Sequence, residues 1–196
     1  MRNPIHKRLE NLESWQHLTF MACLCERMAP NFVLFCQMTE QKPADKTYHN
    51  ILNLVWEFLT VKEAKINFES QLEKLEEIIP DVNDYDFFGV VPALDACEAL
   101  GELLHAIIAG ETLEKAIQIS QISLGTVCSL LETQEDRDLS ETELKDREEI
   151  EEELDLQWQI YRLLKDCEKR DVDLILSLRN EIKQEGISNI GIKIEQ

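Results

Sequence analysis

The sequence has few of the residues and motifs that mark common enzyme classes. Only six glycines and five prolines occur among 196 residues. The glycines form neither a G-x-G-x-x-G fingerprint nor a phosphate-binding loop. The G-x-S-x-G turn of many hydrolases and the H-E-x-x-H pair of zinc peptidases are also absent. Because no catalytic motif is present, we expect a binding or regulatory protein rather than an enzyme.

Strand-like alternation of polar and apolar residues is missing over any stretch long enough to build a sheet. Apolar residues instead recur at helical spacing along most of the chain. We therefore predict an all-α fold, a single-domain up-and-down bundle of about seven or eight helices over residues 1–196. Residues from about 187 to 196 have no helical period, and we expect a non-helical tail or short extended segment there.

Two boundaries in the first half of the chain follow from local signals. The apolar pattern that begins at Ser14 meets Pro30, which lacks an N–H and should interrupt the helix. Thr60 and Glu63 have the spacing of a capping box, which predicts a new helix from Val61 to about Ile79.

The second half of the chain carries clearer boundary signals. Gly110 offers a left-handed end to the apolar helix before it. Ser140 and Glu143 have the spacing of a second capping box. From Glu148 to Gly186 we expect one long helical pattern with a kink near residues 169–171.

Long apolar runs are also missing. No uninterrupted run approaches the ~18 residues that a membrane span needs, and the start, MRNPIHKRLENLESW, lacks the apolar core of a signal peptide. Both absences predict a soluble, cytoplasmic protein, where thiols stay reduced. The six cysteines then resemble small buried hydrophobic residues: Cys23, Cys25, Cys36, Cys97, Cys128 and Cys167.

Positive charge is scarce. The formal net charge is -19, from 39 acidic and 20 basic residues, so direct nucleic-acid binding is disfavoured. The same charge attracts a basic protein, a polyamine or a metal cation, although solubility alone is an ordinary reason for it. Our leading hypothesis is a non-enzymatic binding or regulatory bundle whose acidic surface, particularly residues 148–155, meets a basic protein partner. Monomer and homodimer both remain open.

One stripe on the predicted central helix, residues 87–109, suggests an alternative function. Asp95, Glu98, Glu102 and His105 fall within an arc of about 80° on an otherwise apolar helix. Carboxylates and imidazole are ligands for Mn, Fe or Zn. From residue 75 to 114 the formal charge is -10, from ten acidic residues and no Lys or Arg. The alternative is therefore a metal- or small-ligand-binding protein, although no cofactor is implied by a motif.

The stripe does not match a di-iron carboxylate site. Glu102 and His105 form one E-x-x-H element, but such sites need it on two helices. None of His6, His17 or His49 follows a Glu by three residues. We therefore favour an ordinary role for the stripe, as the solvent-facing edge of the helix or as partners of Lys and Arg from other helices.

His17 lies on the apolar side of its helix, one turn after Glu13. A histidine in that position is more often a hydrogen-bonded core residue than a ligand or a base. We therefore expect His17 to be structural.

Several long segments in order resemble one known family. They are NPIHKRLENLESWQHLTFMACLCERMAPN, LTVKEAKINFESQLEKLEEIIP, GVVPALDACEALGELLH and RLLKDCEKRDVDLI with GISNIGI. Together these segments resemble the YjaG family of bacterial proteins. The resemblance implies a small cytosolic protein with an all-helical, up-and-down fold and no assigned function. It carries over no catalytic residue, cofactor or partner.

Overall fold

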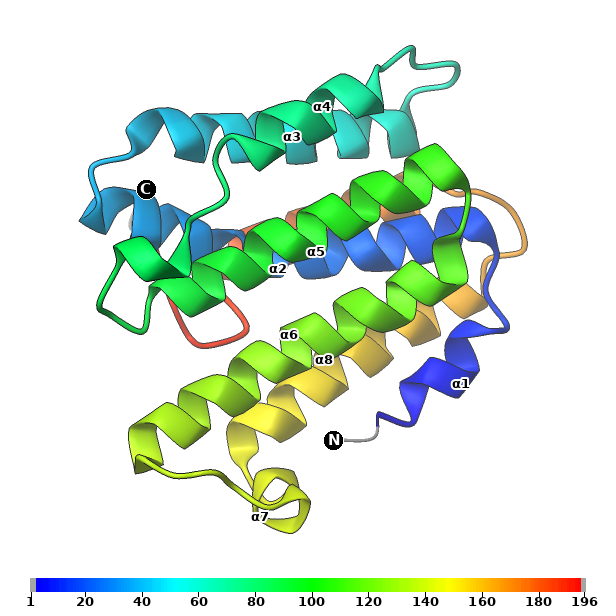
Figure 1. Ribbon diagram of the computed structural model, residues 1–196. Helices are drawn as coiled ribbons and strands as arrows, with labels where there is room; N and C mark the ends of the chain where they lie inside the picture. Colours follow the sequence, from blue (N-terminus) through cyan, green and yellow to red (C-terminus); the bar gives the residue numbers. More distant parts are fainter. Residues whose placement is uncertain (1–2, 195–196) are drawn as a thin grey trace.

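The computed structural model describes residues 3–194, and predictions for residues 1–2 and 195–196 lie outside that range. Within it the chain forms nine α-helices, one short 3-10 helix (η1) and a single isolated β-bridge, so the all-α prediction is confirmed (Figure 1). The elements run in the order α1 Ile5–Leu9, α2 Ser14–Met38, α3 Lys42–Thr60, α4 Phe68–Glu76, η1 Val82–Asp84, α5 Val90–Ala109, α6 Thr112–Glu135, α7 Glu141–Lys145, α8 Glu148–Lys165 and α9 Val172–Glu185.

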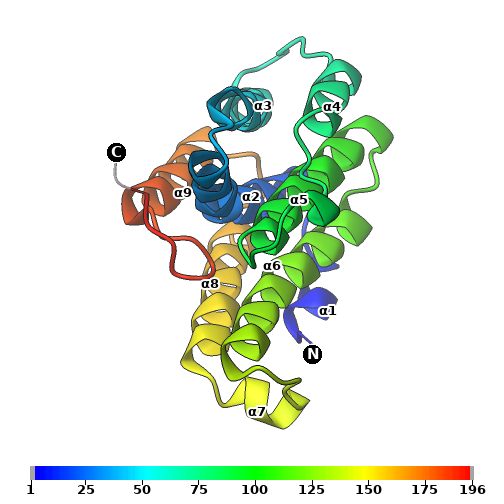
Figure 2. The same cartoon turned by 60° about the vertical axis from the view of Figure 1, so that its left-hand side comes forward.

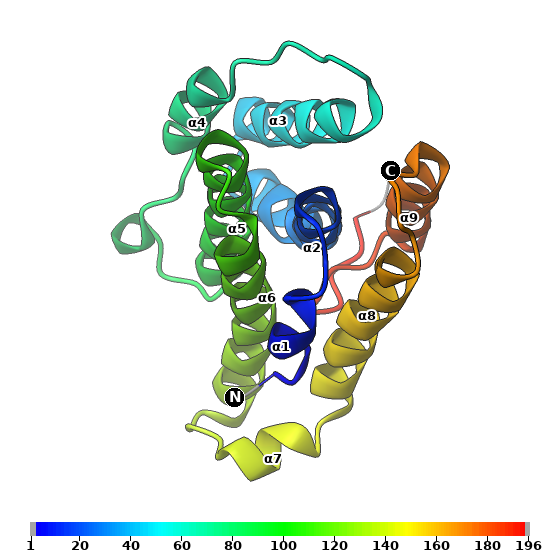
Figure 3. The same cartoon turned by 90° about the vertical axis from the view of Figure 1, so that its right-hand side faces the viewer.

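Helix α2 lies at the centre of the bundle. It contacts α3, α5, α6, α8 and α9, and Figure 3 shows α5 and α6 on one side of it with α8 and α9 on the other. By length and composition alone α2 could cross a membrane, but 83% of its most apolar window is buried inside the protein. Within this fold its apolar character is that of a core helix.

Pro30 does not break α2, so the predicted interruption is wrong. The helix continues for two more turns to Met38. Without an N–H, Pro30 costs the helix one hydrogen bond to the carbonyl of Glu26. The side chains that follow, Phe32 and Phe35, are buried in the main core. Their packing holds the segment helical in spite of the lost bond.

The predicted helix over residues 61–79 begins later than expected. The hydroxyl of Thr60 donates to the carbonyl of Trp56 (2.7 Å) and does not cap a new helix. Helix α4 starts at Phe68, where the side chain of Asn67 accepts a hydrogen bond from the N–H of Ser70 (2.9 Å). Thr60 back-bonds within the helix it ends, which is a common alternative for Thr.

The boundaries in the second half agree better with the sequence. Gly110 adopts the left-handed conformation (φ 77°), and Ser140 with Glu143 forms the capping box. The long pattern after Glu148 is divided, however, into α8 and α9, because Asp171 accepts from two backbone N–H groups and starts a separate helix. That division gives nine α-helices in residues 3–194, where we predicted about seven or eight.

Two apolar clusters hold the helices together. The main core joins residues from α1 to α6 with residues from α8 and α9. A smaller cluster packs where α6, α7 and α8 meet, away from the main core. Its buried residues are Leu124, Val127, Leu131, Leu139, Leu144 and Ile150.

The segment after α9 packs back against the bundle (Figure 2, red). An antiparallel bridge pairs Ile187 with Lys193, as expected for a short extended segment. Asn189 is buried, accepts from the side chain of Asn31 on α2 (2.9 Å) and donates to the carbonyl of Ser123 on α6 (2.9 Å). Polar contacts therefore tie this segment to two core helices.

We predict that Leu103→Ala destabilises the protein by about 2–5 kcal/mol, because Leu103 is fully buried on α5. The matched control is Leu163→Ala on α8, where the side chain is 40% exposed and the change should stay within about 0.5 kcal/mol. Urea unfolding measures both. Equal losses for the two variants would contradict the assigned core.

Candidate functional site

The predicted stripe on α5 is divided between solvent and helix α6. Asp95 accepts a hydrogen bond from the hydroxyl of Thr126 on α6 (2.7 Å). Glu102 pairs with Lys115 and accepts from the amide of Gln118 (2.9 Å). The other two members of the stripe, Glu98 and His105, are exposed.

The stripe does not form a metal centre with residues from elsewhere. Within residues 3–194 no group of three or more His, Cys, Asp or Glu side chains is placed to hold a metal ion. Asp95 and Glu102 use their oxygens on a hydroxyl, an amide and an ammonium group from α6. The geometry is that of a helix edge packed against its neighbour, with two side chains left in solvent.

Burial raises the pKa of Asp95. The hydrogen bond from Thr126 opposes that rise, and the nearby charge of Glu98 adds to it. Desolvation therefore outweighs the single hydrogen bond that the carboxylate receives.

The buried histidine and the thiols are structural. His17 is held between the hydroxyl of Thr112 (2.9 Å) and the carbonyl of Leu9 (2.8 Å), as predicted. Burial lowers its pKa. All six cysteines are free, and burial raises the pKa of Cys36 to about 12 and that of Cys23 further. Four of the six, Cys23, Cys25, Cys36 and Cys97, are buried, and buried thiols with raised pKa values are poor nucleophiles.

The acidic residues of the segment from residue 75 to 114 gather along α4, η1, α5 and the start of α6. Eight of the ten are exposed, and none of these eight makes an ion pair within the part of the chain that the structure describes. We call this surface the acidic face. Its exposed members are Glu76, Glu77, Asp81, Asp84, Asp86, Glu98, Glu111 and Glu114.

The predicted acidic run over residues 148–155 is only partly a surface. Five of its carboxylates are exposed, but Glu153 is fully buried. Glu153 accepts from the guanidinium of Arg27 (3.1 Å), the hydroxyl of Ser123 (2.7 Å) and the amide of Gln157 (2.9 Å). Its charge is therefore used inside the protein.

Further buried polar groups extend this cluster toward both ends of the chain. Ser120 donates to the side-chain oxygen of Gln157 (2.6 Å), and so does the amide of Asn3 (3.0 Å). On the other side Asn189 donates to the backbone carbonyl of Ser123. We call the buried polar residues around Glu153 the polar core.

Our sequence reasoning missed the polar core, although one signal was available. Glu153 and Gln157 share a face of α8 with Ile150, Ile160 and Leu164, at the spacing that turns toward a core. A charge at such a position needs an internal partner, so the pattern is typical of a buried ion pair.

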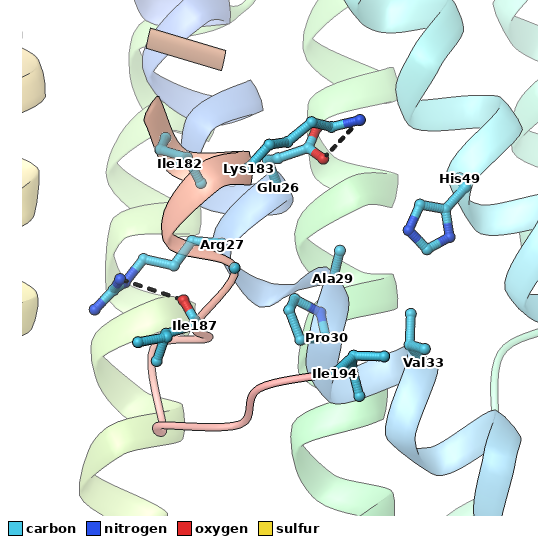
Figure 4. Close-up of a pocket in the computed structure, with 11 residues that line it drawn as sticks. Glu26, Arg27, Ala29, Pro30, Val33, His49, Ile182, Lys183, Ile187 and Ile194 are labelled. Atoms are coloured by element: carbon cyan, nitrogen blue, oxygen red, sulfur yellow. Dashed lines mark hydrogen bonds and ion pairs between the residues drawn. The ribbon is translucent and has the colours of Figure 1, made fainter. Parts of the chain in front are cut away.

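A pocket of about 230 Å³ opens beside α2, between α3, α9 and the segment that follows α9 (Figure 4). Its wall is apolar along Ala29, Pro30 and Val33, and its rim carries Glu26 and Lys183. No sequence pattern indicated this pocket, because its residues come from distant parts of the chain.

Comparisons with known proteins place the chain in a family. A family model described as a protein of unknown function, DUF416, matches residues 4–193. The chain belongs to the DUF416 family. An uncharacterised protein of Haemophilus influenzae is 76% identical, and the uncharacterised protein YjaG of Escherichia coli is 55% identical, each over the full length of both chains. The resemblance to the YjaG family is confirmed.

The DUF416 fold has also been seen in a crystal. The structure of a DUF416 family protein from Shewanella baltica matches with a TM-score of 0.90 at 34% identity and covers 98% of this chain and 100% of that chain. The helical arrangement described above is therefore that of the family.

We predict that Glu153→Ala destabilises this DUF416 protein by about 3–5 kcal/mol, because Arg27, whose side chain is only 11% exposed, would lose its partner. The control is Glu152→Ala, an exposed neighbour whose loss should change stability by no more than about 0.5 kcal/mol. Denaturant unfolding compares the two. A loss below about 1 kcal/mol for Glu153→Ala would contradict the polar core.

The raised pKa of Asp95 predicts a pH dependence. Its ordinary value is 3.8, and the folded protein disfavours the ionised form, so the penalty is absent below about pH 4, grows as the pH rises toward the folded pKa, and is constant above it. Asp95→Asn should therefore stabilise the DUF416 protein at neutral pH, and the gain should vanish in acid.

Thermal unfolding at several pH values tests this dependence. Glu98→Gln is the control, since it removes one negative charge from an exposed site on the same helix. A gain for Asp95→Asn that is independent of pH, or that Glu98→Gln reproduces, would refute the assignment.

Proposed function

We propose that the protein is a non-enzymatic binding or regulatory protein of the cytoplasm that meets a basic protein partner through its acidic face. The single observation that carries the proposal is that this face presents eight exposed carboxylates without an ion-pair partner in residues 3–194. Lys115 beside it is engaged with Glu102. The face therefore keeps its negative charge for an external partner.

Charge and compartment support this choice. A net charge of -19 opposes binding to phosphate backbones and favours a cationic protein surface. Six free cysteines in the described chain are typical of a reducing compartment. The metal or small-ligand alternative at the stripe has less support, because Asp95 and Glu102 are engaged by α6.

The exposed part of the 148–155 run is a second, smaller acidic surface. It lies on α8, which Figure 3 places on the other side of α2 from α5. Since Glu153 forms a buried ion pair with Arg27, this run exposes fewer carboxylates than its sequence implies. We therefore place the docking surface on the acidic face.

Two charge-matched variants test the location. One carries Glu→Gln changes on the acidic face, at Glu76, Glu77, Glu98 and Glu111; the other carries four on α8, at Glu148, Glu149, Glu151 and Glu152. The measurement is cross-linked capture of partners from cell extract, followed by binding of the purified partner. We expect the α8 variant to bind as the wild type does and the acidic-face variant to bind about tenfold more weakly or less.

Salt provides the second arm of this experiment. Because the Debye length falls from about 10 Å at 0.1 M to about 3 Å at 1 M ionic strength, affinity should fall steeply over that range. A partner held equally by the acidic-face variant, or retained unchanged at high salt, would overturn the proposal.

A further inference from the structure

The pocket beside α2 combines an apolar wall with opposite charges at its rim. Figure 4 shows Ala29, Pro30 and Val33 along one side and Ile194 below them, with Lys183 and Glu26 together at the top. Isoleucines from α9 and the segment after it complete the apolar wall. They are Ile182 and Ile187.

Glu26 is the buried acceptor of this pocket. Its side chain is 6% exposed and receives one full hydrogen bond, from the indole N–H of Trp56 (2.7 Å). Its other oxygen lies 3.5 Å from the ammonium of Lys183, whereas charged hydrogen bonds are usually about 2.7–2.9 Å long. A buried carboxylate with an incomplete partner retains capacity for a second donor.

Pro30 removes one backbone donor from the turn of α2 that lines the pocket. Since proline has no N–H, the backbone carbonyl of Glu26 has no donor one turn later in α2. Both Glu26 and Pro30 line the pocket.

Donors lie next to these acceptors. The side chain of Lys183 is 42% exposed and, within residues 3–194, makes only the long contact to Glu26. Arg27 directs one guanidinium nitrogen to the carbonyl of Ile187 at 3.5 Å, at the limit of a hydrogen bond. Arg27 is thus engaged by Ile187 and by Glu153, whereas Lys183 keeps free N–H groups for an anion at the rim of the pocket.

We propose that this pocket binds a small apolar α-amino acid in its zwitterionic form. The ammonium group bonds to the carboxylate of Glu26, the carboxylate group bonds to Lys183, and the apolar side chain lies against the isoleucines and Val33. The ligand's ammonium and carboxylate groups then give close partners to Glu26 and Lys183, whose charged atoms lie 3.5 Å apart.

Ligands that carry a single charge fit this pocket less well than a zwitterion. A simple amine would compete with Lys183 for Glu26 and leave that lysine without a partner. A simple carboxylate would face the carboxylate of Glu26. The pocket volume is about 230 Å³, whereas sites for drug-sized ligands measure about 300–1,000 Å³. The smaller volume agrees with a ligand as small as an amino acid.

Calorimetric titration of the full chain with L-leucine tests the proposal, and two analogues each remove one charge. Leucinamide lacks the carboxylate, and 4-methylpentanoate lacks the ammonium group. We expect leucine to bind saturably and each analogue to bind about tenfold more weakly or less. Absence of saturable binding by leucine, isoleucine, valine, methionine and phenylalanine would overturn the proposal, and so would equal binding of leucine and either analogue.

Two variants assign the roles of the two charges. Glu26→Gln should weaken the binding of leucine by about tenfold or more. The exposed Glu98→Gln is its control. Since Glu26 is buried, Lys183→Gln offers a variant at a half-exposed site that does not disturb the core. It should lower the affinity for leucine to that for leucinamide and leave leucinamide unchanged.

Lys165→Gln is the matched control, because Lys165 on α8 is similarly exposed and does not line the pocket. Equal loss of leucine binding in Lys183→Gln and Lys165→Gln would contradict the assigned role of Lys183. These measurements do not depend on the acidic face, so their failure would leave the proposed function untouched.

Discussion

The burial of α2 on all sides is the constraint on which the rest of the structure depends. From Gln16 to Cys36 no side chain of this helix is exposed, so each polar group on it needs an internal partner. His17 finds Thr112 on α6, Glu26 finds Trp56 on α3, and Arg27 finds Glu153 on α8. The central helix therefore dictates which polar residues its neighbours carry and where those neighbours sit.

Much of the helical architecture could be predicted because its signals are local. Apolar spacing, Gly110 and the capping box at Ser140 depend on residues within a few positions of one another. The predictions at Pro30 and Thr60 were wrong because other interactions outweighed the local preference of each residue. Buried Phe32 and Phe35 hold the helix beyond Pro30, and the hydroxyl of Thr60 bonds to the preceding turn.

The candidate sites were less predictable because they depend on contacts between distant residues. The charge of the acidic face follows from residue types alone, but the exposure of its carboxylates depends on the fold. The apolar face of α8 indicates that Glu153 turns inward, but nothing within a few residues shows that Arg27 is its partner. The pocket joins Glu26 to Lys183 and Ile194, and no periodicity connects positions so far apart in the chain.

The polar core also sets the order in which the protein can complete its folding during synthesis. Asn3 lies near one end of the described chain and Asn189 near the other, yet both bond to the cluster around Gln157 and Ser123. A ribosome makes the first of these residues long before the second. The central polar cluster must therefore wait, partly unsatisfied, until nearly all the helices have emerged, and late closure of this kind slows folding and lengthens the time that the unfinished core is open to water.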